Sequence, residues 1–186
     1  MKNFGLLVLV NSIVLVGIFV ISQIIGQNTL SNMENPHILV KKNARTLQIF
    51  DGQTLIKTYK ISLGFKPVGD KEIEGDGKTP EGDFYVYFKN EQSAFYLSLG
   101  VSYPNIEDAT RGLKENLISQ TEFDEIVKAN NEKTMPPQKT KLGGEIFIHG
   151  GGCDADWTAG CMALENEEMK EIFDVISVGT GVKIKP

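Results

Sequence analysis

The sequence has no excess of basic residues. Its 24 Asp and Glu outnumber its 19 Lys and Arg, and the formal net charge is −5. A nucleic-acid partner needs clustered Lys and Arg to contact its phosphates, and no such stripe is present. Internal repeats and low-complexity segments are also absent. Nucleic-acid binding and a repeat architecture are therefore excluded, and 186 residues suit one globular domain with an appendage.

Cysteine is scarce, because Cys153 and Cys161 are the only two. In an exported protein the pair could form one disulfide, and with His149 and Asp154 or Asp156 it could bind zinc. The spacing matches no common zinc pattern, and a disulfide would consume a thiol that the motif below needs. Both remain alternatives, and we expect no metal and no organic cofactor.

One long hydrophobic run is present, at residues 4–25, and it carries no charge. At 1.5 Å per residue a helix of this length spans a bilayer core of about 30 Å. Lys2 precedes the run, so this end should stay in the cytoplasm. We predict that residues 1–26 are a transmembrane anchor that holds the domain outside the cytoplasm. A cleaved signal peptide, which would give a secreted protein, is the alternative, although signal peptides have shorter apolar regions.

The rest of the chain divides into a polar linker, residues 27–36, and a folded domain, residues 37–186. Short runs of strand-forming residues dominate the domain, and helical spacing is confined to a few segments. The predicted strands are 38–40, 46–50, 55–61, 84–88, 95–101, 146–148, 162–164 and 182–184; the helical segments are 106–117, 122–128 and one that Asn166 caps. We therefore predict a mostly β domain, of the sandwich or barrel type, with short helices.

The motif with the clearest chemistry lies between residues 145 and 164. An apolar run at 146–148 delivers His149 and stops at three glycines, while Cys161 follows Gly160 and precedes a second apolar run. If these two strands pair, the thiol and the imidazole meet. A Cys becomes a nucleophile at neutral pH when an adjacent base takes its proton, and a preceding glycine lets backbone N–H groups approach the oxyanion.

A second segment, Lys78-Thr79-Pro80-Glu81-Gly82-Asp83-Phe84, is dense in turn-forming residues. Glycine, proline and aspartate at this density indicate a rigid turn. We expect this turn to lead into the strand at Phe84 and to shape the site.

These residues resemble the L,D-transpeptidase catalytic domain (YkuD-like), whose pattern is His-Gly, a spacer, then Ser-x-Gly-Cys-x-Arg. His149-Gly150 and Thr158-Ala159-Gly160-Cys161 match it, and the Lys-Thr-Pro-Glu-Gly-x-Phe segment is the second signature. Thr158 keeps the hydroxyl of the family's Ser, whereas Ala163 replaces the Arg. Asp156-Trp157 and the residues after Leu164 resemble a subgroup that lacks this Arg. The resemblance covers roughly residues 38–186.

The resemblance implies a peptidoglycan L,D-transpeptidase that acts on stem peptides in cell-wall cross-linking, remodelling and cell shape. It implies roles for particular residues: Cys161 as nucleophile, His149 as general base and acid, Gly150 as the carbonyl that orients His149, Gly160 as an oxyanion-hole N–H beside that of Cys161, and Thr158, Trp157 and Asp156 as substrate-binding residues. Two alternatives remain. An L,D-carboxypeptidase would resolve the same acyl-enzyme with water, and a non-catalytic wall-binding module would be favoured if Ala163 marked loss of activity.

Overall fold

The computed structural model describes residues 30–186, and residues 35–186 form one compact unit. The predicted membrane anchor and the first part of the predicted linker lie outside the described residues. None of the helices within residues 30–186 has the length and apolar character needed to cross a bilayer. The anchor at residues 1–26 therefore stays a prediction.

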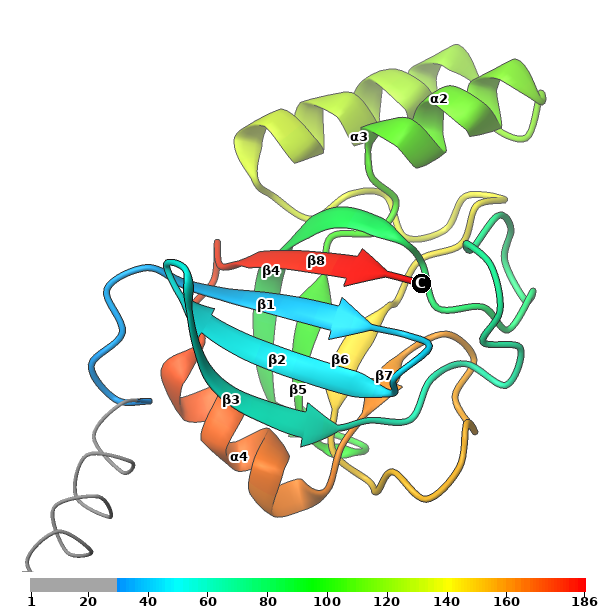
Figure 1. Cartoon of the computed structure of the whole chain (residues 1–186). Helices are drawn as coiled ribbons and strands as arrows, with labels where there is room; N and C mark the ends of the chain where they lie inside the picture. Colours follow the sequence, from blue (N-terminus) through cyan, green and yellow to red (C-terminus); the bar gives the residue numbers. More distant parts are fainter. Residues whose placement is uncertain (1–29) are drawn as a thin grey trace, which may run out of the picture. The chain divides into compact units, whose positions relative to one another are not determined.

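The described chain is built on one eight-stranded sheet (Figure 1). Its spatial order is β3-β2-β1-β8-β4-β5-β6-β7. The strand bounds are β1 Pro36–Lys41, β2 Thr46–Asp51, β3 Thr54–Lys60, β4 Gly82–Ser93, β5 Tyr96–Val101, β6 Phe147–His149, β7 Met162–Ala163 and β8 Gly181–Lys185. The hairpin from β2 to β3 turns at Asp51-Gly52, where Gly52 has φ +56°, a conformation that glycine adopts without strain. Every predicted strand is present.

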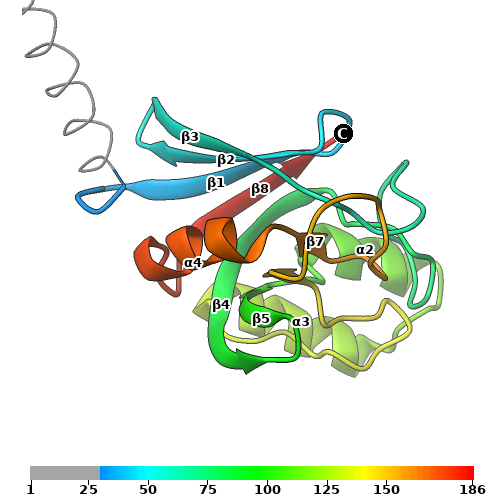
Figure 2. The same cartoon turned by 90° about the horizontal axis from the view of Figure 1, so that it is seen from below.

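The sheet curls strongly, as Figures 1 and 2 show from two directions. The chain that follows β3 reaches the opposite edge and pairs with β7. Ser62 and Ala163 exchange two backbone hydrogen bonds of 2.9 and 3.0 Å, and the Phe65 N–H donates to the Thr158 carbonyl at 2.9 Å. The prediction of a mostly β domain is confirmed, and the architecture is a curled half-barrel of one sheet rather than a sandwich of two.

The core lies inside this curl. Ile38 and Val40 on β1 alternate with outward residues, as do Leu47 and Ile49 on β2, and all four are fully buried. Helix α4, Asn166–Val175, covers part of the curl with Met169, Ile172 and Phe173. These apolar side chains recur at helical spacing, so one stripe of α4 faces the sheet.

The expected cap of α4 needs a correction. Glu165 is the N-cap, and it makes no side-chain capping hydrogen bond. Asn166 lies inside the helix, and its Oδ1 accepts the Gly151 N–H at 2.9 Å. The amide of Asn166 is thus used to hold the glycine loop that follows His149.

The remaining helices are α2, Ile106–Lys114, and α3, Gln120–Glu132, which follow β5 and precede β6 in the sequence. They lie together in a separate layer (Figure 1). Both begin with capping boxes, at Asn105 and Ser119. They enclose a small apolar cluster that contains Ala109, Ile118, Ile126 and Leu142. This insertion leads into the segment 133–146, part of which borders the site.

Candidate active site

Strand pairing brings His149 and Cys161 together. Strands β6 and β7 are parallel neighbours, with Ile148 opposite Met162 and His149 opposite Ala163. Side chains alternate along a strand, so Cys161, two residues before Ala163, belongs to the same face as His149. Both residues line one cavity of about 250 Å³. The strand pairing that the sequence argument took as its condition is thus present.

The His149 ring is held in one orientation. Its Nδ1 lies 2.6 Å from the Gly150 carbonyl oxygen. A carbonyl can only accept a hydrogen bond, so in the neutral ring Nδ1 carries the proton and Nε2 keeps a free lone pair. The rings of Phe95 and Trp157 lie 4.7 and 5.6 Å from the imidazole, centroid to centroid, and only 3% of His149 is exposed. Desolvation lowers the pKa of His149, although the Gly150 hydrogen bond opposes this. The structure thus favours a neutral base.

The Cys161 thiol donates to a backbone carbonyl. Its Sγ lies 3.5 Å from the backbone carbonyl oxygen of Glu145. Burial is the main cause that raises the pKa of Cys161, and the Glu145 carboxylate raises it further, against the Phe147 N–H and Lys71. The neutral thiol is therefore the favoured form of Cys161.

Thr158 organises the turn before Cys161. Its Oγ1 donates to the Cys161 carbonyl at 2.8 Å and accepts the Gly160 N–H at 3.1 Å. The Gly160 N–H, which the sequence predicts to be an oxyanion donor, donates to the Thr158 hydroxyl here, and its role in an oxyanion hole stays a prediction. The Cys161 N–H is the remaining donor of the predicted pair. The hydroxyl of Thr158 thus braces the turn from within.

The second signature packs directly against this turn. Gly160 has φ +140°, and a Cβ at this position would lie 2.7 Å from the Lys78 carbonyl oxygen. Thr79 Oγ1 accepts the Gly64 N–H at 3.0 Å, and the buried Lys42 Nζ donates to the Thr79 carbonyl at 2.8 Å and to Glu81 at 2.7 Å. The segment therefore shapes the turn before Cys161 through backbone contacts.

A matched pair of glycine variants tests this close approach. Gly160→Ala should lower the free energy of unfolding by about 1–3 kcal/mol for the positive φ and by a similar further amount for the clash with Lys78. Gly179 also has positive φ, at +92°, but a Cβ there meets no atom within 4 Å. Gly179→Ala should therefore cost only the first amount. Denaturant unfolding measures both variants, and equal losses would contradict the contact.

The other predicted substrate residues have different surroundings. Asp156 Oδ2 accepts from Arg45 Nη2 at 2.7 Å, and its Oδ1 accepts the Leu63 N–H at 2.9 Å. The two carboxylate oxygens thus hold the loop to the turn between β1 and β2 and to the chain after β3, and the substrate-binding role of Asp156 stays a prediction. Trp157 donates from Nε1 to the Gly152 carbonyl at 3.1 Å, and its half-exposed ring lies beside His149.

Ala163 occupies the position where the family pattern has Arg. It is fully buried, and its backbone closes the sheet against Ser62. Its short side chain supplies no cation at this position.

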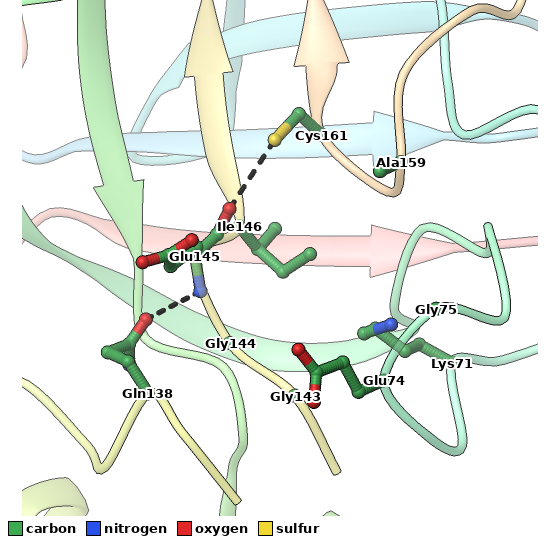
Figure 3. A pocket seen from close by; sticks show the side chains of 10 residues that line it. All are labelled: Lys71, Glu74, Gly75, Gln138, Gly143, Gly144, Glu145, Ile146, Ala159 and Cys161. Carbon is green, nitrogen blue, oxygen red and sulfur yellow. Dashed lines mark hydrogen bonds between the residues drawn. The ribbon is translucent and has the colours of Figure 1, made fainter. Parts of the chain in front are cut away.

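A second cavity, of about 280 Å³, also reaches Cys161 (Figure 3). Its walls come from the loop 71–75 and from the segment 138–146. Lys71, Glu74, Gln138 and Glu145 line it, and none of them was singled out from the sequence. The pair Gly143-Gly144 was the available signal, because consecutive glycines often mark backbone that must take unusual dihedrals.

The cysteine alternatives are not favoured by the geometry. Both cysteines are free, and the buried Cys153 thiol donates to Glu165 Oε1 at 3.4 Å. Within residues 30–186, no group of three or more His, Cys, Asp or Glu side chains is arranged to hold a metal ion. The structure does not assemble the proposed zinc ligands.

Comparisons with known proteins agree on one family. A family model described as the L,D-transpeptidase catalytic domain, YkuD, matches residues 35–184. The curated relative "Putative L,D-transpeptidase YafK" of Escherichia coli K12 is 26% identical over 148 residues, and the match covers 76% of this chain and 47% of the relative. The chain therefore spans about half the length of the curated relatives that it matches.

Two solved structures share the fold. A point mutant of the helical cell shape determining protein Pgp2 from Campylobacter jejuni has a TM-score of 0.58 and 25% identity, over 83% of this chain and 48% of that one. Bd1075 from Bdellovibrio bacteriovorus has a TM-score of 0.53 and 24% identity, over 84% and 51% of the two chains. With the family match over residues 35–184, these findings show that the chain belongs to the L,D-transpeptidase catalytic domain family.

Proposed function

We propose that the domain is a cysteine L,D-transpeptidase that acts on peptidoglycan stem peptides. One observation carries the proposal: in a chain of this family, the Cys161 thiol and the imidazole of His149 line one cavity, with Nδ1 fixed on the Gly150 carbonyl. This arrangement supplies a nucleophile and a base whose free nitrogen is defined. The proposed substrate, the peptidoglycan stem peptide, is that of the family. Because peptidoglycan lies outside the cytoplasm, we place the domain there as well.

In the first half-reaction, a donor carbonyl that follows an L-centre lies over Cys161. His149 Nε2 takes the thiol proton as Sγ attacks the carbonyl carbon. The S–C bond forms, and the C–N bond to the terminal D-amino acid breaks as its nitrogen receives the proton from His149. The Cys161 N–H would stabilise the oxyanion. The product is a thioester and a free D-amino acid.

In the second half-reaction, an acceptor amine attacks the thioester. Its nitrogen gives a proton to His149, the new C–N bond forms, and the sulfur leaves and regains its proton. Because both half-reactions use His149, the leaving amine and the incoming amine must each come within reach of Nε2. Water in place of the amine would give hydrolysis instead.

The acid–base properties of Cys161 and His149 support a proton transfer that occurs when the substrate carbonyl is attacked. Burial raises the pKa of Cys161 and lowers the pKa of His149, so both groups favour their neutral forms at neutral pH. A neutral imidazole can accept the thiol proton when the carbonyl arrives. This mechanism needs no cation at the position of Ala163.

Product analysis tests the proposed reaction. The protein is incubated with a tetrapeptide stem and a primary amine, and products are separated by chromatography. We expect release of the terminal D-amino acid together with an equal amount of the new amide. Release with a tripeptide acid as sole second product would identify an L,D-carboxypeptidase, and no release at all would favour the wall-binding module.

We also propose that residues 1–26 anchor the domain in the membrane. Cell fractionation of the full chain should recover the protein with membranes, and protease added outside should digest the domain. A variant that begins at Gln27 behind a cleavable signal should be soluble, which provides the control. A mature wild-type protein that begins near Gln27 would contradict the anchor and show signal cleavage.

A further inference from the structure

The chain takes a strained turn beside the nucleophile. Glu145 has φ +54°, in the left-handed region that non-glycine residues rarely adopt. Gly143, two residues before it, has φ +87°. A strained non-glycine residue persists only when its surroundings fix it, and such residues cluster at functional sites. The turn directs the Glu145 carbonyl at the Cys161 thiol, with Sγ and O 3.5 Å apart.

One side chain fixes this turn from the other side. Gln138 Oε1 accepts the Glu145 N–H at 2.7 Å, while its Nε2 donates to the Pro136 carbonyl at 2.7 Å and to the Tyr103 carbonyl at 3.2 Å. All three contacts are to backbone atoms, so the amide is locked in one orientation. Figure 3 shows the chain of contacts from Gln138 through Glu145 to Cys161.

The packing around Gln138 leaves the turn little freedom. A Cβ on Gly144 would lie 2.6 Å from the Gln138 Cα and 2.6 Å from its carbonyl oxygen. The backbones at these two positions are therefore in close contact, and only glycine allows it. The conformation of Glu145 is thus set both by a hydrogen bond and by the fit of its neighbour.

We propose that Gln138 is a positioning residue for the nucleophile: through the left-handed turn at Glu145 it holds the carbonyl that receives the Cys161 S–H. This rests on the proposed role of Cys161 as nucleophile. Cys161 and Glu145 each line both cavities, whereas His149 lines only one of them. The carbonyl therefore keeps the sulfur at the junction of the two cavities until a donor peptide arrives and His149 takes the proton.

The proposal separates the backbone of Glu145 from its side chain. A carbonyl oxygen stabilises only the protonated thiol, so loss of this contact should make the thiol easier to ionise. It should also misplace the sulfur, and a misplacement of about 1 Å can cost about 10²-fold in rate. Neither effect requires the carboxylate.

Two variants at Glu145 form a matched pair. Both Glu145→Val and Glu145→Gly remove the carboxylate, but the β-branched side chain opposes the left-handed conformation and glycine favours it. The rate of Cys161 alkylation by iodoacetamide is measured against pH in a Cys153→Ser background. The midpoint of the alkylation rate against pH should lie at lower pH in the Val variant than in the Gly variant. The kcat of the Val variant for D-amino acid release should be about 10²-fold lower than that of the Gly variant, at similar KM.

Gln138→Ala provides the second test, with its midpoint compared with that of wild type. Its alkylation midpoint should lie at lower pH than that of wild type. A merely structural loss would instead lower Tm and leave the alkylation midpoint unchanged. Equal midpoints for the Val and Gly variants, or a wild-type midpoint in Gln138→Ala, would overturn the proposal. Alkylation needs no stem peptide, so a failure of the proposed reaction would be seen separately from a failure of this positioning.

Discussion

Replacing Cys161 with alanine should abolish release of the D-amino acid and formation of the amide. Loss of a nucleophile from a related acyl-transfer mechanism costs on the order of 10⁶-fold in kcat, and no other thiol lines the cavities that meet at Cys161 within residues 30–186. The fold should survive, because the hydrogen bond from the Cys161 thiol to the Glu145 carbonyl is weak, and the contact with Thr158 uses the Cys161 backbone, which alanine keeps. Product analysis and a thermal melt together separate chemistry from folding.

The matched control is Cys153→Ser. The Cys153 thiol is buried and donates to Glu165, a contact that a serine hydroxyl can replace. This variant should keep most of the activity. Equal loss in the two cysteine variants would instead favour a disulfide or zinc account of the pair.

Replacing His149 with alanine should remove alkylation of Cys161 near neutral pH. In the proposed mechanism the imidazole takes the thiol proton, and general-base catalysis of this kind contributes about 10²–10⁴-fold. Without it, the rate should recover only as pH approaches the pKa of the thiol itself, which burial raises above its ordinary value. Iodoacetamide kinetics from pH 5 to pH 10, in a Cys153→Ser background, provide the measurement.

The direction of the wild-type pH profile follows from the same two groups. Burial lowers the pKa of His149, so the base becomes protonated, and activity falls, only below the usual range for histidine. The thiol ionises only above its usual range. Activity should therefore be flat through neutral pH.

His37→Ala is the control for His149→Ala, because His37 stacks on Phe50 and lines neither cavity at Cys161. Unchanged alkylation kinetics in His149→Ala would exclude the dyad.

The elements of the fold could be predicted because their signals are local. Alternating apolar residues specify β1 and β2, and Asp51-Gly52 specifies the hairpin turn that follows. The curl could not be predicted in the same way. It depends on Ser62 pairing with Ala163, residues far apart in the chain, and no local pattern encodes that pairing.

The same distinction between local signals and distant contacts applies to the site. His149 stood out because it ends a short apolar run just before three glycines. Cys161 stood out because it follows Gly160 and precedes a second apolar run. The engagement of the Gly160 N–H by Thr158 and of Asp156 by Arg45 depends on side-chain geometry that a spacing rule does not contain. The contact from Cys161 to Glu145 was missed for a further reason: it uses a backbone carbonyl, and a sequence does not show where a carbonyl points.

The central claim is that Cys161 carries the acyl group, and mass spectrometry of the protein tests it most directly. The enzyme is mixed with a tetrapeptide stem without an amine acceptor, quenched in acid and weighed intact, then digested and mapped. We predict an added mass equal to the tetrapeptide minus its terminal D-amino acid, located on Cys161 and absent from Cys161→Ala. Release of the D-amino acid with no adduct on Cys161, or with the adduct on another residue, would contradict the account.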